Sequence, residues 1–332
     1  MDVTGEGTQK SFVLPRSRLG GRKKLKTVSI VVPVYNEGDN ILHFTNAVRE
    51  VMDKQPYKWN LLFVDDGSRD NSLELLEGLQ AQYENIKVLA LSRNRGHQIA
   101  LTCGLDHAKG DAVISMDGDM QHPPALIPTL LAKWEEGYEI VQTIRQDTQG
   151  VSWLKKKTSK MYYQLINNLS NVHIRPGGSD FRLLDRRAVD AMNQYREHDR
   201  FLRGIVTLLG FNFAEVPFVA PPRFAGESKY SLKKMVKLAV DGIVGYSVLP
   251  LRTAFIMGIF LAFLSVCFTV HALYVYINGE AVSGWTTIMV CMSLFGGAQL
   301  IILGIMGEYL GRIYTEVKNR PLYLIKNQEV EK

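Results

Sequence analysis

The sequence predicts an α/β fold: a nucleotide-binding, doubly wound and mostly parallel sheet, followed by an interfacial helix and two transmembrane helices. Three observations favour this architecture. Short β-branched and apolar runs alternate with helical stretches in the first half of the chain, which is typical of parallel sheets. Acidic and turn residues follow directly after three of these runs. Two long stretches near the C-terminus, 253–278 and 281–307, contain no Asp, Glu, Lys or Arg.

The alternation of strands and helices runs from residue 28 to residue 116. The expected strands are 28–35, 60–65, 87–92 and 112–116, and the expected helices between them are 41–53, 71–83 and 98–108. Further along the chain, a polar helix is expected at 155–168 and another strand at 179–184. Such an order predicts a sheet with its ligand site at the carboxyl ends of the strands.

Asp117 and Asp119 follow the strand expected at 112–116 and lie one residue apart. Alternate side chains of an extended backbone point to the same face, so these two carboxylates can share one hard divalent cation. Magnesium held by one or two carboxylates usually completes its shell with phosphate oxygens and water. Gly118 lets a ligand approach the backbone closely. The pattern therefore predicts a metal-assisted phosphate site.

Two other strand ends carry similar residues. Asn36 and Glu37 follow the first strand, and Asp65-Asp66-Gly67-Ser68 follows the second, where Asp66 can reach a base or ribose. Because ligands of open α/β sheets bind beyond the carboxyl ends of strands, the three acidic strand ends should converge on one crevice.

Taken in order, these segments resemble the motif series of family 2 inverting glycosyltransferases. The motifs are Val32-Pro33-Val34-Tyr35-Asn36-Glu37, Asp65-Asp66-Gly67-Ser68, Arg93-Asn94-Arg95-Gly96, Asp117-Gly118-Asp119-Met120-Gln121 and Gly178-Ser179-Asp180-Phe181-Arg182. The stretch from Arg223 to Tyr230, with the two apolar segments, narrows the resemblance to the polyprenyl-phosphate glycosyltransferases, relatives of dolichol-phosphate mannose synthase. The resemblance covers roughly Lys26 to Arg320.

The resemblance implies a GT-A-like catalytic domain and a site for Mg²⁺ or Mn²⁺. Direct metal ligation is expected from Asp119, with Asp117 as a donor-sugar or metal partner and Gln121 beside them. The nucleoside would be framed by Pro33, Tyr35, Glu37 and Asp66, and Arg93 would meet phosphate or the sugar-facing loop.

The implied acceptor is a polyisoprenyl phosphate. Its second pKa of roughly 6 makes it a nucleophile at neutral pH. Asp180 is expected on the acceptor side, either orienting the acceptor or acting as a general base, and both roles stay open. The cations expected to hold the acceptor phosphate are Arg200, Arg203, Arg223 and Lys229. A single displacement from a donor of the UDP-glucose or GDP-mannose type would invert the anomeric centre.

The domain boundaries follow from charge and hydropathy. We expect a basic tail at 1–26, a catalytic domain at 27–230, an interfacial amphipathic helix at 231–250, a two-helix transmembrane hairpin at 251–314 and a C-terminal tail at 315–332. Each charge-free stretch exceeds the roughly 20 residues that span a bilayer. The ends of the two apolar stretches that lie away from their connection are flanked by cations: Arg252, Arg312, Lys318 and Arg320. The connection itself, at 278–280, has no cation. This asymmetry predicts cytoplasmic termini and a cytoplasmic catalytic domain. The family resemblance implies that the membrane is a bacterial inner membrane.

Other functions fit the sequence less well. The net charge of +6 comes without a helix-turn-helix, RNP or finger pattern, so membrane proximity explains it better than nucleic acid. A processive polysaccharide synthase is disfavoured because the Gln-X-X-Arg-Trp motif is missing and only two spans are expected. A non-catalytic nucleotide-sugar sensor or scaffold is disfavoured by the intact Asp117, Asp119 and Asp180. The small-residue spacing of Gly307 and Gly311 is compatible with a homo-oligomer.

Overall fold

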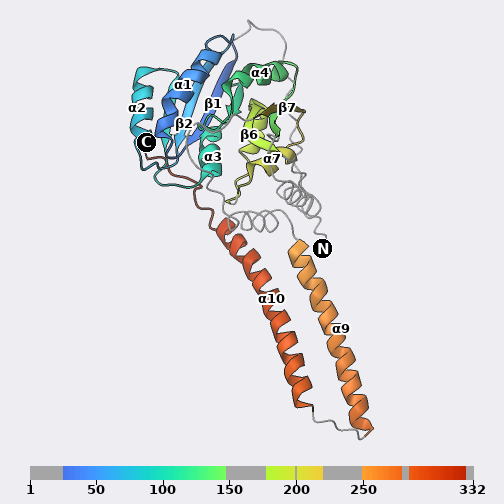
Figure 1. Ribbon diagram of the computed structural model, residues 1–332. Coiled ribbons are helices and arrows are strands. Elements are labelled where there is room, and N and C mark those ends of the chain that lie inside the picture. Colours follow the sequence, from blue (N-terminus) through green and yellow to red (C-terminus); the bar gives the residue numbers. More distant parts are fainter. Residues whose placement is uncertain (1–24, 147–176, 199, 220–248, 279–283, 327–332) are drawn as a thin grey trace, which may run out of the picture.

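A seven-stranded mixed sheet forms the centre of the N-terminal domain (Figure 1). The computed structural model describes residues 25–146, 177–198, 200–219, 249–278 and 284–326. The strand order is β3-β2-β1-β4-β6-β5-β7. The strands are β1 (Thr27–Val34), β2 (Lys58–Asp65), β3 (Ile86–Ala90), β4 (Ala112–Ser115), β5 (Ile140–Gln146), β6 (Gly178–Asp185) and β7 (Phe213–Val219).

Most neighbouring strands run parallel. β1 pairs in parallel with both β2 and β4, β2 with β3, and β5 with β7. β6 is the exception, because it runs antiparallel to β4 on one side and to β5 on the other. The chain winds outward from β1 to β3 and then returns to place β4 on the opposite side of β1. The carboxyl ends of β1 and β4 therefore flank the point where the strand order reverses, where α/β sheets bind their ligands.

Helices cover both faces of the sheet. One face packs against α1 (Gly38–Met52), α2 (Ser72–Gln82) and α4 (Ile127–Glu135), which follows the short 3₁₀ helix η1 (Pro124–Leu126). The other face packs against α3 (His97–His107), α6 (Arg186–Met192) and α7 (Leu202–Leu208). The alternation along β1 explains this division, since Ile30 and Val32 belong to the first core and Val31 to the second. The doubly wound fold predicted from the sequence is confirmed.

The strands and helices expected between residues 28 and 116 are all present, with ends that differ by up to a few residues. The strand expected at 179–184 is β6. The polar helix expected at 155–168 and most of the interfacial helix expected at 231–250 lie outside the described residues.

Two long apolar helices, α9 (Leu249–Ile277) and α10 (Trp285–Val317), extend side by side away from the sheet (Figure 1). Both contain a window that is long and apolar enough to cross a membrane, at Leu249–His271 and Leu294–Val317. Only 6% and 0% of these windows is buried inside the protein, which distinguishes them from core helices. An apolar surface of this kind fits helices that are surrounded by hydrocarbon.

After α10 the chain returns to the sheet domain. Residues 323–326, here called the C-terminal strap, lie against the free edge of β3: Ile325 forms an antiparallel bridge with Leu91, and Ser92 N–H donates to Leu324 O at 2.8 Å. Tyr323 Oη donates to Asp106 Oδ2 on α3 at 2.7 Å. At the end of α10, Glu316 accepts hydrogen bonds from the backbone N–H and from Nδ1 of His198, at 2.7 and 3.0 Å. The membrane helices are thus tied to the sheet domain beyond the chain connection itself.

Candidate active site

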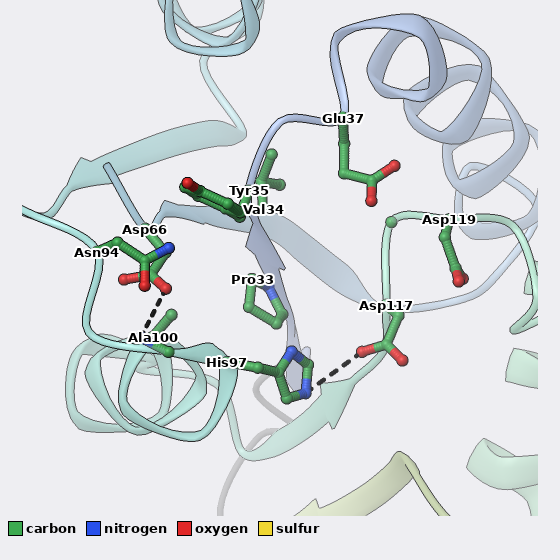
Figure 2. A pocket seen from close by; sticks show the side chains of 12 residues that line it. Pro33, Val34, Tyr35, Glu37, Asp66, Asn94, His97, Ala100, Asp117 and Asp119 are labelled. Carbon is green, nitrogen blue, oxygen red and sulfur yellow. Dashed lines mark hydrogen bonds and ion pairs between the residues drawn. The ribbon is translucent and has the colours of Figure 1, made fainter. Parts of the chain in front are cut away.

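A cavity of about 400 Å³ opens at the carboxyl ends of β1, β2 and β4 (Figure 2). It lies at the point where the strand order reverses, as expected for this fold. The residues that line it come from the ends of these strands, from the loops that follow them, and from the start of α3 and the loop before it. They are Pro33, Val34, Tyr35, Glu37, Asp66, Asn94, Gly96, His97, Ala100, Asp117, Gly118 and Asp119.

Six of the residues predicted for the donor and metal site line this cavity: Pro33, Tyr35, Glu37, Asp66, Asp117 and Asp119. Arg93 and Gln121 are not among the lining residues. Arg93 is exposed in the loop between β3 and α3. Gln121 lies next to the cavity, because its backbone N–H donates to Asp119 Oδ1 at 3.1 Å and its Oε1 accepts from Arg145 Nη1 at 3.2 Å.

The loop after β1 is held against the loop after β2. Asn36 adopts a left-handed backbone with φ +54°, which its short polar side chain tolerates. Its N–H donates to Ser68 Oγ at 3.0 Å, and its Oδ1 accepts from Arg69 N–H at 2.8 Å. Glu37 N–H donates to Ser72 Oγ at 2.9 Å. These reciprocal bonds fix Tyr35 and Glu37 at the rim of the cavity.

Asp66 joins the end of β2 to the loop before α3. Its carboxylate accepts backbone N–H bonds from Arg95 at 2.6 Å and from Gly96 at 2.8 Å. Burial raises the pKa of Asp66, and these two N–H donors oppose part of that rise. Gly67 has φ +69°, and a Cβ there would lie 2.8 Å from Asn94 N. Only glycine lets the two loops approach this closely.

Asp117 and Asp119 lie in the loop that follows β4. The next residue of this loop, Met120, has a strained backbone. Met120 has φ +62°, a left-handed conformation that non-glycine residues rarely adopt. Figure 2 shows both carboxylates at the cavity, and His97 Nε2 lies 3.5 Å from Asp117 Oδ1. Strained backbone of this kind concentrates at functional sites.

Asp180 and Arg182 lie two residues apart on β6, so their side chains share one face of the strand. Arg182 Nη2 donates to Asp180 Oδ1 at 2.6 Å, and both side chains are buried. Arg203 on α7 adds two bonds to the same carboxylate, from Nη2 to Oδ2 at 2.9 Å and from Nε to Oδ1 at 3.1 Å. Gln98 Nε2 donates to Asp180 Oδ2 at 3.4 Å.

These partners decide the charge of Asp180. Burial by itself would raise the pKa of the carboxyl, but Arg203, His97 and Arg182 together hold the pKa well below its usual range. His97 Nε2 lies 3.7 Å from Asp180 Oδ2, so this imidazole stands between Asp180 and Asp117. An ionised Asp180 held by two guanidinium groups is a weak proton acceptor. The geometry therefore favours an orienting role over general-base catalysis.

The four cations predicted to bind the acceptor phosphate lie in different surroundings. Arg203 pairs with Asp180 while its side chain stays 40% exposed. Arg200 is 6% exposed, and its Nη2 donates to Met192 O at 3.0 Å, a position that does not favour contact with a ligand. Arg223 and Lys229 lie outside the described residues.

Four further residues lie at the site without a role predicted from the sequence: His97, Gln98, His122 and Arg182. The spacing of Asp180 and Arg182 was a usable signal, because residues two apart on a strand face the same way. His97 directly follows the Arg93–Gly96 motif, but nothing local shows that the start of α3 faces Asp117. His122 is buried between Asp117 and β6, and burial lowers its pKa. Its position depends on tertiary contacts.

The residues present fit a divalent cation held jointly with a phosphate ligand. Within the described part of the chain, no group of three or more His, Cys, Asp and Glu forms a self-sufficient metal cluster. Asp117 and Asp119 nevertheless line one cavity, and Mg²⁺ is commonly held by one or two carboxylates with substrate phosphates.

Comparison with known proteins identifies the family of this chain. The family model for glycosyl transferase family 2 matches residues 29–192. The glycosyltransferase YkcC of Bacillus subtilis is 42% identical over 300 residues, which cover 90% of this chain and 93% of that protein. The SfII prophage-derived bactoprenol glucosyl transferase of Shigella flexneri is 38% identical over 300 residues, covering 90% and 97%.

Among solved structures, glucosyl-3-phosphoglycerate synthase from Mycobacterium tuberculosis, in complex with Mn²⁺, UDP-glucose and phosphoglyceric acid, has a TM-score of 0.46 and 17% identity. The match covers 66% of this chain and 78% of that one. The sequence relatives, aligned over nearly their whole length, place the chain in a defined class. It belongs to glycosyl transferase family 2.

Proposed function

We propose that this protein transfers glucose from a nucleoside-diphosphate glucose to a polyisoprenyl phosphate at the membrane surface, with inversion at the anomeric carbon. Relatives named bactoprenol glucosyl transferase, at 37 to 38% identity over about nine-tenths of the chain, support the sugar and the lipid. The two apolar helices support access to a lipid acceptor. The observation that carries the proposal is the joint position of Asp117, His97 and Asp180 at the switch point of the sheet.

The charge of the cavity supports metal dependence. Its lining contains four carboxylates, those of Glu37, Asp66, Asp117 and Asp119, and none of its described lining residues is Lys or Arg. A nucleoside diphosphate is itself an anion and would be repelled by this lining. Asp119 and Asp117 would hold a divalent cation that offsets the repulsion and supplies Lewis-acid stabilisation of the leaving diphosphate. The protein's own residues then bind and orient the two substrates.

In the proposed reaction an oxygen of the acceptor phosphate attacks the anomeric carbon while the bond from that carbon to the donor diphosphate breaks. A phosphate monoester is largely ionised at neutral pH, so the nucleophile needs no strong base. Asp180 holds Arg203 and Arg182, and the partly exposed Arg203 offers a cation to the acceptor phosphate. From an α-linked donor, a single displacement of this kind gives a β-linked lipid phosphosugar.

The membrane geometry completes the proposal. We infer a cytoplasmic sheet domain and cytoplasmic chain ends from the cations that flank the apolar helices on that side, Arg252, Arg312, Lys318 and Arg320. The lipid phosphate would then meet the cavity where the sheet domain approaches the bilayer.

A panel of nucleotide-sugars tests the proposal directly. Membranes containing the protein are incubated with undecaprenyl phosphate and each donor, UDP-glucose and GDP-mannose among them, and the lipid product is analysed by mass spectrometry. We expect a hexosyl-phosphate lipid from a glucose donor. Polymer formation would favour a processive synthase, and donor binding without any product would favour a sensor.

A further inference from the structure

His122 connects the loop that carries Asp117 with the strand that carries Asp180. The residue is 6% exposed. On one side, the backbone N–H of Asp117 donates to His122 Nδ1 at 2.8 Å. On the other side, His122 Nε2 lies 2.7 Å from Ser179 Oγ. The two halves of the candidate active site are therefore bridged by one buried imidazole.

The hydrogen-bond pattern fixes the tautomer of this ring. A backbone N–H can only donate, so Nδ1 must be the unprotonated nitrogen. Nε2 then carries the proton and donates it to Ser179 Oγ. The same Oγ accepts the backbone N–H of Phe181 at 3.2 Å. Ser179 and Phe181 flank Asp180 on both sides, so the bridge ends on the backbone that positions the Asp180 carboxylate.

Packing holds the bridge in place. The His122 ring stacks on Phe181 with ring centroids 5.2 Å apart and an interplanar angle of 25°. Between Asp117 and His122 the loop contains Met120, whose left-handed backbone persists only where neighbouring contacts determine it. The bond from Asp117 N–H to His122 fixes the start of this strained loop, and the bond from Gln121 N–H to Asp119 fixes its end.

We propose that His122 is a positioning residue: its two hydrogen bonds set Asp117 relative to Asp180, and so hold the donor sugar beside the acceptor phosphate. This inference rests on the proposed function. It makes no use of a change in the charge of His122. If the bridge is lost, the donor should still bind. The share of its sugar that passes to water instead of to lipid should then be larger than in the wild-type protein.

Three substitutions separate positioning from packing. His122→Phe keeps an aromatic ring that can stack on Phe181 but removes both hydrogen bonds. His122→Asn places an amide oxygen where Nδ1 accepts from Asp117, so it should restore part of the loss. Ser179→Ala removes the far end of the bridge. The matched control is Ser29→Ala, because Ser29 is also a buried serine that accepts a backbone N–H, from Gly110 at 2.9 Å, at the opposite end of β1.

Four quantities are measured on the full-length protein: glucosyl transfer to undecaprenyl phosphate, hydrolysis of UDP-glucose, UDP binding with Mn²⁺, and hydrogen exchange in the peptide containing Asp117. For His122→Phe we expect transfer to fall about 10- to 100-fold, the range for lost outer-shell contacts. The ratio of hydrolysis to transfer should rise, UDP affinity should change by less than about 3-fold, and the Asp117 amide should exchange faster. Adding Ser179→Ala to His122→Phe should lower transfer only slightly further, because the two substitutions break the same bridge.

The control decides how a loss is interpreted. Ser29→Ala should lower the melting temperature with an unchanged ratio of hydrolysis to transfer. If His122→Phe behaves like Ser29→Ala in that ratio and in exchange at Asp117, the positioning role is overturned. If the wild-type protein makes no lipid product, the proposed function fails. The hydrogen-exchange comparison still decides then whether His122 holds the Asp117 loop.

Discussion

Arg203 and Asp180 form a two-bond ion pair, with Nη2 to Oδ2 at 2.9 Å and Nε to Oδ1 at 3.1 Å, although they lie on different elements, α7 and β6. Arg182 binds the same carboxylate, so this cluster of two cations and one anion carries a net charge of +1. The neighbouring cavity is lined by four carboxylates. The site thus has an acidic half suited to a metal-bound diphosphate and a basic half suited to a second phosphate.

Asp180→Asn should abolish most transfer while leaving donor binding nearly intact. Because the arginines keep Asp180 ionised, raising the pH from about 6 to 8 should not restore activity, whereas loss of a true general base would be relieved as the acceptor ionises. Transfer rates and donor affinity across that pH range check this. Recovery at high pH would assign Asp180 as the base.

Asp180→Asn should also destabilise the fold by about 3–5 kcal/mol, since it leaves the buried Arg182 without its carboxylate. Arg182→Met in the same chain removes that stranded charge. The double variant should therefore regain stability in denaturant unfolding but not transfer. If it regains transfer as well, Asp180 acts only through stability.

Asp119→Ala should lower turnover by on the order of 10² to 10³, the scale for removing one preorganised electrostatic contact. Its fold should survive because Asp119 lies at an open cavity. Exhaustive chelation of the wild-type protein should have the same effect, and UDP binding should lose its dependence on Mn²⁺ in the variant. Glu50→Ala, a surface change on α1, is the matched control. Full activity after chelation would remove the metal from the account.

Gly67→Ala should weaken donor binding, whereas Gly210→Ala should not. Both glycines are left-handed, with φ +69° and +68°, so both substitutions incur about 1 kcal/mol of backbone strain. Only at Gly67 would the new Cβ collide with the backbone of Asn94 in the cavity wall, because nothing lies within 4 Å at Gly210. Titration with UDP, alongside thermal unfolding, separates the two effects. Equal UDP affinities would contradict this picture of the cavity wall.

A cysteine at Asn278, the last described residue after α9, should react with an impermeant thiol reagent added to intact cells. A cysteine at Lys54, exposed on the sheet domain, should react only after the cells are opened. The expectation follows from the cation asymmetry around α9 and α10. The parent chain, with Cys267 and Cys291 present, is the background control. The reverse labelling pattern would place the sheet domain outside.

The first four strands and most of the cavity could be predicted from the sequence because their signals are local. Apolar runs identify β1 and β2, and the residues at their ends, such as Glu37 and Asp66, reach the cavity as a consequence of parallel strand geometry. β5 and β7 were not expected. β7 contains Pro217, which argues against a central strand and is tolerated here because β7 lies at the edge of the sheet.

The rest of the site depends on contacts between segments far apart in the chain. Arg203 reaches Asp180 from another element, and His122 reaches Ser179 across 57 residues. The contact between the C-terminal strap and β3 also depends on distant segments. Nothing in the local sequence around Tyr323 and Ile325 shows that the chain returns to β3 there. Periodicity describes which face a residue occupies, but the partner on that face is decided by the tertiary packing.

Transfer of radiolabelled glucose from UDP-glucose to undecaprenyl phosphate tests the central claim most directly. In the wild-type protein with Mg²⁺ or Mn²⁺, label should appear in the organic extract as a single glucosyl-phosphate lipid. In Asp119→Ala, the amount of label in that extract should be lower by a factor on the order of 10² to 10³. Label that stays in water while UDP-glucose binds, or that accumulates in polymer, would contradict the assignment of this chain as a lipid-phosphate glucosyltransferase.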